Sequence, residues 1–304
     1  MKRFLSIALC CFLLLASCGI EADTSSQNES AGETSTDVDV TEGAKRVINS
    51  LNYKNNGKMS DNDGPAFAVY SKKGYNGASV VVDIADSEIN TLLPDGRYVN
   101  GYCFLGLDVY DGSYWTNCAD VGLCWSGENG GWHIFYNIYE TLHEDMRSWY
   151  ESGKMLPKNG RYRLTLTVTR NDYVKLTVES LDGPFRDSVE LAVKGALADG
   201  SNTSMLFNVA LDYPPNTKLD SNGNACEDWA EITLANSDKG LYFKKLHATE
   251  LTLFKKGEPL DWEDDLISSV GIWPDKTVKE FDYYPTEVFI FDGKQYYVNL
   301  DMNR

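Results

Sequence analysis

The sequence predicts an all-β protein in which two antiparallel sheets pack as a β-sandwich, and three observations support this fold class. Apolar and polar residues alternate with a period of two over many short segments, as they do in half-buried strands. Turns rich in Gly, Asn, Asp and Pro separate these segments. Long stretches of helical periodicity are scarce. Because strands with one wet and one dry face must cover the dry face, two packed sheets are favoured.

The first half of the folded body contains four predicted strands. The segment SVVVDI at 79–84 contains three consecutive valines, which is typical of a buried strand. Segment 101–110, GYCFLGLDVY, alternates instead. Its apolar face carries Cys103, Leu105, Leu107 and Val109, and its other face carries Tyr102, Phe104, Asp108 and Tyr110. The Asp111-Gly112 dipeptide is a turn signal, and strands at 116–125 and 132–139 follow it.

The clearest hairpin is predicted at 161–180, where Leu, Val and Thr alternate on both sides of a central turn. Asn171 and Asp172 can form this turn because both residue types tolerate a positive φ. Later strands are predicted at 188–193, 204–211, 240–243 and 246–254. One short connecting helix is predicted at 140–151, ETLHEDMRSWYE.

A last hairpin, TEVFIFDGKQYYVNL, turns at Asp292-Gly293 near the end of the chain. It is predicted to be either an appended β subunit or an extra pair of strands on the sandwich. The sandwich itself is predicted to span 45–262 and this C-terminal β extension 263–304.

The N-terminal end predicts export. A cationic start is followed by a short apolar run at 4–16, as in a secretory signal, and by Leu15-Ala16-Ser17-Cys18. This ending resembles the lipobox of bacterial lipoproteins. The resemblance implies that 1–17 is a signal peptide and that Cys18 carries a lipid holding the chain on the extracytoplasmic face of the cell membrane. The alternative is an ordinary signal with a chance cysteine.

The segment after Cys18 is predicted to be a flexible acidic tether, 18–44. It is rich in Ser, Thr, Gly, Asp and Glu, and from Gly19 onward it has no Lys, Arg or aromatic residue. Such a composition cannot bury enough apolar surface to offset the entropy of ordering. The whole chain has a net charge of −17, with 45 acidic and 28 basic residues. This acidity argues against nucleic acid as a partner, because phosphates select Lys and Arg.

Seven cysteines divide by position. Two leave with the predicted signal and Cys18 is the predicted lipid site, which leaves Cys103, Cys118, Cys124 and Cys226. An even number outside the cytoplasm predicts two disulfides of open connectivity. Free buried thiols are the alternative.

The succession of strands resembles concanavalin A-like lectin and glucanase domains. The segments that carry the resemblance, within 66–262, are SVVVDI, GYCFLGLDVY, DVGLCW, GGWHIFYN, RYRLTLTVTR and LHATELTLFKKGEPLDW. The resemblance implies a jelly-roll sandwich with one face that often holds carbohydrate.

Aromatic residues gather near carboxylates and amides between 102 and 139. Sugars offer C–H faces to aromatic rings and hydroxyls to carboxylates and amides, so this mixture suits a glycan. The predicted ligand-binding residues are Tyr102, Asp108, Trp115, Asp120, Trp125, Trp132 and Asn137. The alternative is an ordinary sandwich core with loop aromatics.

The segment DSNGNACEDWAE, 220–231, has oxygen-bearing residues at the spacing of a calcium loop. The predicted Ca²⁺ ligands are Asp220, Asn222, Asn224, Asp228 and Glu231. Ala225 stands where such loops carry the Gly of the sharp turn. A surface loop rich in Asn and Asp is the alternative.

An enzymatic role finds less support. The glucanases of the resembled superfamily carry Glu-x-Asp-x-x-Glu on one strand, and here the nearest match, at 83–88, lacks the first Glu. No catalytic residue is predicted. The sequence therefore favours a membrane-anchored glycan-binding sandwich. The alternatives are a glycan hydrolase or lyase and a structural or protein-interaction domain of the cell envelope.

Overall fold

The computed structural model describes residues 43–49, 66–144, 147–158, 160–212, 240–262, 267–271, 286–292 and 294–303. They lie in one compact unit, Thr41–Arg304. Every named element in these ranges is a β-strand, which confirms the all-β fold class. Among these residues there is no helix with the length and apolarity needed to span a membrane.

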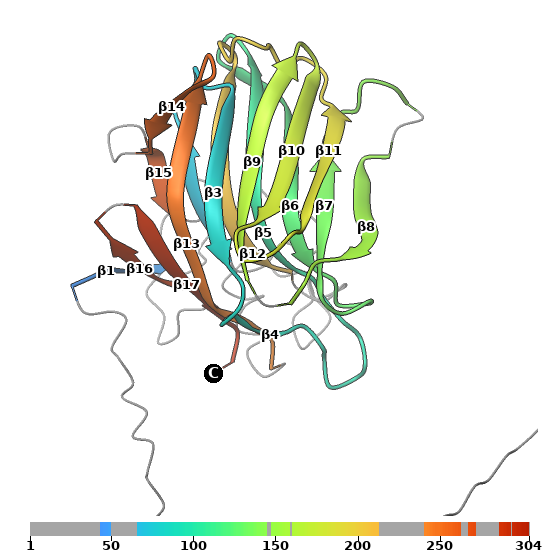
Figure 1. Ribbon diagram of the computed structural model, residues 1–304, viewed down its shortest axis with the longest axis vertical. Coiled ribbons are helices and arrows are strands. Elements are labelled where there is room, and N and C mark those ends of the chain that lie inside the picture. The colour runs from blue at the N-terminus through green and yellow to red at the C-terminus, as the bar shows by residue number, and fades with distance from the viewer. Residues whose placement is uncertain are drawn as a thin grey trace, which may run out of the picture. The chain divides into compact units, whose positions relative to one another are not determined.

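The strands form two antiparallel sheets, which lie one in front of the other in Figure 1. The ten-stranded sheet A runs in the order β1 (Lys45–Asn49), β16 (Thr286–Phe291), β17 (Gln295–Asp301), β13 (Tyr242–Lys255), β3 (Gly77–Asp83), β9 (Arg161–Arg170), β10 (Tyr173–Ser180), β11 (Arg186–Ala192), with β4 (Glu88–Asn90) and β14 (Glu258–Asp261) paired to β13. The seven-stranded sheet B runs in the order β15 (Ile267–Gly271), β2 (Ala66–Ser71), β12 (Thr203–Leu211), β5 (Gly101–Asp111), β6 (Tyr114–Trp125), β7 (Trp132–Ile138), β8 (Trp149–Met155).

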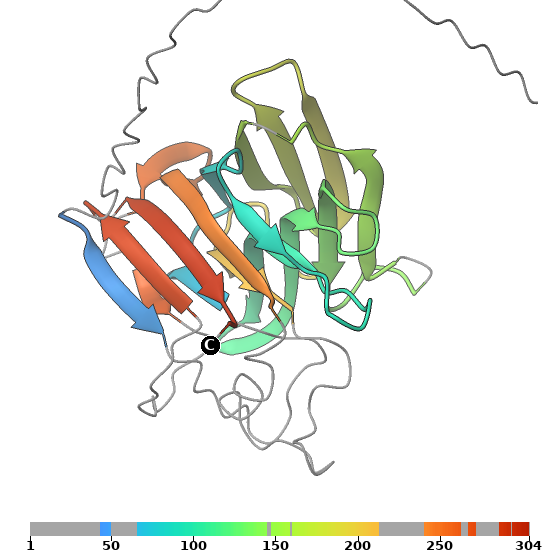
Figure 2. The same cartoon turned by 90° about the horizontal axis from the view of Figure 1, so that it is seen from below.

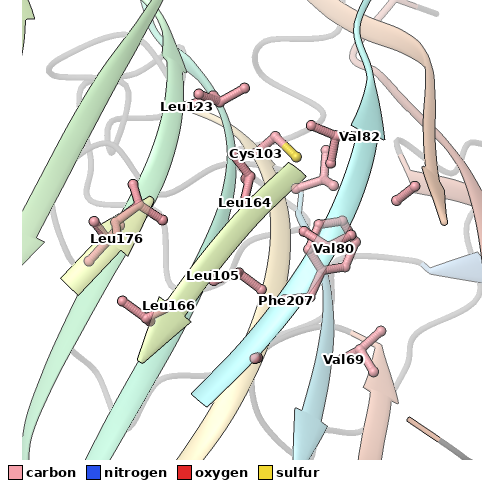
Figure 3. Close-up of a cluster of buried hydrophobic side chains, with 14 of the residues drawn as sticks. Val69, Val80, Val82, Cys103, Leu105, Leu123, Leu164, Leu166, Leu176 and Phe207 are labelled. Carbon is pink, nitrogen blue, oxygen red and sulfur yellow. The ribbon is translucent and has the colours of Figure 1, made fainter. Parts of the chain in front are cut away.

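The core lies between the two sheets and is built by the alternating apolar residues. Figure 3 shows side chains from both sheets meeting there, including Val80 and Leu164 of sheet A and Leu105 and Phe207 of sheet B. These four side chains have no solvent-exposed surface. Their burial contributes roughly 25 cal/mol per Å² of apolar surface removed from water, which makes this layer the main source of stability.

The hairpin 161–180 is confirmed as β9 and β10. Asp172 adopts a φ of 65° in its turn, the left-handed conformation expected for an Asn-Asp turn. The predicted strands 240–243 and 246–254 are one continuous strand, β13. A bulge between Phe243 and Leu246 separates the two halves, with Lys245 at a φ of 59°.

The helix predicted at 140–151 is wrong. Thr141 bridges to Val193, and Trp149 begins the edge strand β8, which pairs with β7. Local sequence preference is weaker than the backbone hydrogen bonds that β7 offers at the edge of its sheet, so tertiary pairing decides this segment.

The C-terminal hairpin is an extra pair of strands on the sandwich, not a separate subunit. β17 pairs with β13, and β16 pairs with β1. Figure 2 shows the blue strand β1 beside the red C-terminal strands. Val288, Val298 and Leu300 are fully buried, so this pair of strands contributes side chains to the core between the two sheets.

The prediction of two disulfides is also wrong, because Cys103, Cys118 and Cys124 are free thiols. Cys103 faces the core, whereas Cys118 and Cys124 lie six residues apart on β6. Six strand residues span about 20 Å, far beyond the reach of a disulfide. Cys226 lies outside the described residues.

Candidate functional site

The face of sheet B that turns away from sheet A carries an unusual mixture of aromatic, acidic and amide side chains. We call it the outer face of sheet B. Alternation places there the residues of β5, β6 and β7 that do not enter the core. Cross-strand register brings them together, with Asp108 opposite Cys118 and Asp120 opposite Asn137.

Two neighbouring rows of this face form the candidate site, which we call the two-row site. The first row runs across three strands as Asp120, Asn137 and Trp149. The second row contains Asp108 and Cys118, and the amide of Tyr139 donates to the Cys118 carbonyl oxygen at 3.1 Å. Since neighbouring strands lie about 4.8 Å apart, each row presents its side chains as a short ladder.

Trp115 completes the second row. Its indole Nε1 donates a hydrogen bond of 2.9 Å to Asp108 Oδ1, and its ring lies 4.9 Å from the ring of Tyr139. Trp115 is 44 % exposed and Tyr139 is 63 % exposed. A register shift between Val109 and Tyr110 pairs Tyr110 with Trp115 at this end of β5 and β6. The result is an aromatic pair open to solvent beside a carboxyl group.

The Asp108 carboxyl is buried, and burial raises its pKa above the usual range. Hydrogen bonds from Trp115 and Tyr110 act in the opposite direction and lower the pKa, but burial is the larger effect. Asp108 therefore keeps its proton to a higher pH than an exposed aspartate does. In that form it can donate a hydrogen bond or a proton.

Asp120 lies over the backbone of β5. A Cβ placed on Gly106 would meet Asp120 Oδ1 at 3.0 Å, so the glycine leaves room for this carboxyl. Because Asp108 pairs with Cys118, Asp120 is its diagonal neighbour on the next strand. Diagonal neighbours are about 7–8 Å apart. The site thus holds two separate carboxyls on adjacent strands.

A second aromatic group lies on the same face. Phe135 is at its centre, with ring centroids 4.9 Å from Tyr102, 5.5 Å from Trp149 and 5.7 Å from Phe104. The Tyr102 hydroxyl donates to Asp212 at 2.9 Å, and burial raises its pKa. Trp149 is 40 % exposed, so this aromatic group reaches solvent at its β8 end.

The structure brings five of the predicted ligand residues to this face: Tyr102, Asp108, Trp115, Asp120 and Asn137. Trp125 instead packs partly against the core, with Lys158 Nζ 5.9 Å from its ring centroid. Trp132 is 2 % exposed and packs 5.5 Å from Phe243 of the opposite sheet. Trp132 as a ligand contact is corrected, because its side of β7 is the core side.

Sequence reasoning missed Trp149, Phe135 and Glu151 as residues of this face. Trp149 and Glu151 stand two residues apart, the spacing that puts side chains on one face of a strand. The helix predicted over 140–151 conceals this strand spacing. Phe135 belongs to β7, whose two faces are both bulky.

The predicted calcium ligands, Asp220, Asn222, Asn224, Asp228 and Glu231, lie outside the described residues, as does Cys18. The calcium site and the lipid site stay predictions. Among the residues that are described, no group of three or more His, Cys, Asp or Glu side chains is placed to hold a metal ion.

Comparison with known proteins gives neither a family nor an activity. No family model matches the chain, and no curated protein gives a significant match. Among solved structures, a scytalido-glutamic peptidase with a transition state analog inhibitor is similar at 13 % identity and a TM-score of 0.44, over 80 % of this chain and 99 % of that one. SCP-B of the eqolisin family, in complex with a tripeptide, is similar at 14 % identity and 0.44 over the same shares. The aspergilloglutamic peptidase from Aspergillus niger is similar at 15 % identity and 0.35, over 67 % of this chain and 99 % of that one.

Proposed function

We propose that this protein is an exported lipoprotein, anchored through Cys18 on the extracytoplasmic side of a bacterial membrane, whose sandwich binds carbohydrate on the outer face of sheet B. One observation carries the binding role. Exposed aromatic rings stand at both ends of the two-row site, with carboxyl and amide groups between them on the same sheet face.

The chemistry of the two-row site fits a sugar. Trp115 and Trp149 offer flat apolar surfaces on which the C–H face of a pyranose can stack. Asp120 and Asn137 lie between them and can bond ring hydroxyls, since a carboxylate accepts and an amide both accepts and donates. Asp108 in its protonated form adds a donor. A rigid sheet holds all five groups, so little ordering is lost on binding.

We expect binding to depend on the two exposed tryptophans. On a glycan array the purified unit 41–304, which contains every described strand, should bind a restricted set of glycans. Trp115→Ala and Trp149→Ala should each weaken binding by about tenfold or more, as loss of an aromatic anchor does. The matched control is Tyr114→Ala, because Tyr114 is an exposed aromatic of the same strand, and it should bind like the wild type. If the protein binds no glycan on the array, the result would contradict carbohydrate binding and favour a protein partner.

A second candidate function, hydrolysis of the bound glycan, is favoured by the diagonal pair of carboxyls. Glycoside hydrolysis uses two carboxyl groups about 5–9.5 Å apart, and the positions of Asp108 and Asp120 fit that range. Asp108 would donate its proton to the leaving oxygen as the glycosidic C–O bond breaks. Asp120 would take a proton from the water whose oxygen bonds to the anomeric carbon. Exchange with solvent then restores both groups.

Turnover would depend on both carboxyls and on pH. Asp120→Asn should lower the release of reducing ends by about 100-fold or more while glycan binding persists. Because Asp108 must be protonated to act as the acid, turnover should fall as pH rises through its raised pKa. Glu179→Gln is the control, since it replaces a carboxyl by an amide on β10 of sheet A, away from the outer face of sheet B, and it should leave turnover unchanged. If no glycan retained on the array yields product, the protein is a binder without this activity.

A further inference from the structure

His133 occupies a special position between the sheet and its edge strand. It lies on β7, points to the outer face of sheet B and is only 4 % exposed. Its neighbour across the sheet on one side is Cys124 of β6, and on the other side is Met155 of the edge strand β8. The ring is therefore enclosed where β8 joins the rest of sheet B.

Both ring nitrogens of His133 face backbone carbonyl oxygens. Nδ1 is 2.8 Å from the carbonyl oxygen of Ser152, and Nε2 is 3.2 Å from that of Gly130. A carbonyl oxygen can only accept, and a neutral imidazole has only one N–H to donate. In a neutral ring, the nitrogen without a proton therefore points its lone pair at the lone pairs of a carbonyl oxygen. The imidazolium instead donates one hydrogen bond to each of the two carbonyl oxygens.

Charges around the ring also bear on its protonation. Glu151 Oε1 of β8 is 4.0 Å from His133 Nδ1, and its negative charge stabilises a cation there. Cys124 stays a neutral thiol, because burial raises its pKa well above the usual range.

The two carbonyls belong to the segments that position β8. Ser152 is in the middle of β8, and Gly130 is in the turn that leads into β7. Around them, Ser152 Oγ accepts from the Ile134 amide at 3.3 Å, and Glu151 Oε1 accepts from Asn129 at 3.1 Å. Among the described strands, β8 has a partner on one side only, and its pairing with β7 is irregular between His133 and Phe135. Side-chain bonds therefore matter more here than in an inner strand.

We propose that His133 is a positioning residue whose protonation holds edge strand β8, and with it Trp149 and Glu151, in place on the outer face of sheet B. The protonated ring donates to Ser152 of β8 and to Gly130 of the turn before β7 at the same time, whereas the neutral ring donates to only one of them. The edge is therefore firmer at low pH and loosens as pH rises. The consequence for a ligand rests on the proposed function, because Trp149 lies in the two-row site. The effect of His133 protonation on β8 does not depend on the proposed function.

The protonation state and the edge strand can be measured in ligand-free unit 41–304. NMR of the imidazole nitrogens over about pH 5–8 should show both His133 nitrogens protonated at the acidic end. In the same samples, hydrogen-exchange protection of the amides of β8 and of Leu156, whose N–H donates to the Trp132 carbonyl, should fall by about tenfold or more as pH rises. Amides of the hairpin β9–β10 are the internal control and should show no such change.

Variants separate positioning from simple packing. His133→Gln should give low protection of β8 at every pH, with the pH dependence abolished. His247→Gln, on β13 of sheet A, should leave the β8 profile as in the wild type. A neutral His133 at pH 5, or protection in the wild type that does not change with pH, would overturn the proposal even if His133→Gln fails to fold. None of these measurements uses a glycan, so failure of carbohydrate binding leaves them interpretable.

Discussion

Replacing Trp132 by alanine is expected to lower the free energy of unfolding by about 3 to 5 kcal/mol, the cost of removing a large aromatic side chain from a packed core. Trp132 is almost fully buried, and its ring lies 5.5 Å from Phe243 and 5.8 Å from Trp125. Phe243 belongs to sheet A, so the indole joins the two sheets. Urea unfolding of the unit 41–304, followed by circular dichroism, measures the change.

The control for Trp132 is Trp149→Ala. Trp149 is an indole of the neighbouring strand, but it reaches solvent and its aromatic contacts are with Tyr102 and Phe135 on the outer face. Its loss should cost about 1 kcal/mol or less, mainly from ring contacts. If Trp132→Ala retained stability and lost only ligand binding, the assignment of its side of β7 to the core would be wrong.

The second large effect is expected at Asn117, a buried amide with every hydrogen-bonding group in use. Its Nδ2 donates to the carbonyl oxygens of Glu140 and Lys194, both at 2.9 Å. Its Oδ1 accepts from the amides of Cys118 at 2.9 Å and of Glu140 at 2.8 Å. Asn117 therefore ties β6 to the segment after β7 and to the segment after β11.

We expect Asn117→Asp to lower the free energy of unfolding at pH 7 by about 3 kcal/mol or more. The substitution keeps the shape of the side chain but turns a donor into an oxygen that faces two carbonyls, and each buried group left unpaired costs about 1–3 kcal/mol. The loss should shrink near pH 4, where the new carboxyl gains a proton and can donate one bond. Urea unfolding at both pH values gives the comparison.

Asn137→Asp serves as the matched control, because Asn137 is an exposed amide on the adjacent strand. It should change stability by about 0.5 kcal/mol or less, the usual range for a surface substitution. An equal loss in both variants would contradict the role of Asn117 as a buried connector. It would point instead to an effect of added charge on an already acidic protein.

The strands with clear alternation could be predicted from sequence because the period of two is a local property. In β5, alternation predicts one face with Cys103, Leu105 and Leu107 and another with Tyr102 and Asp108. The structure has the first three in the core between the sheets and the other two outside it. The hairpin β9–β10 was equally accessible, since its turn residues tolerate a positive φ. Local pattern is therefore sufficient for the fold class and for placing Tyr102 and Asp108 on one face of β5.

What the sequence alone determined about this protein is the all-β class, the position of most strands and the alternation of their faces, because these depend on residues near one another in the chain. Only the tertiary structure decided which side of β7 is core, that 149–155 is an edge strand, and that Cys103, Cys118 and Cys124 stay free. Only the tertiary structure shows that Asp108 and Asp120 are diagonal neighbours and that two carbonyl oxygens lie beside the His133 ring. These features depend on strand register and on the packing of one sheet against the other, which join residues distant in sequence and leave no local periodicity to reveal them.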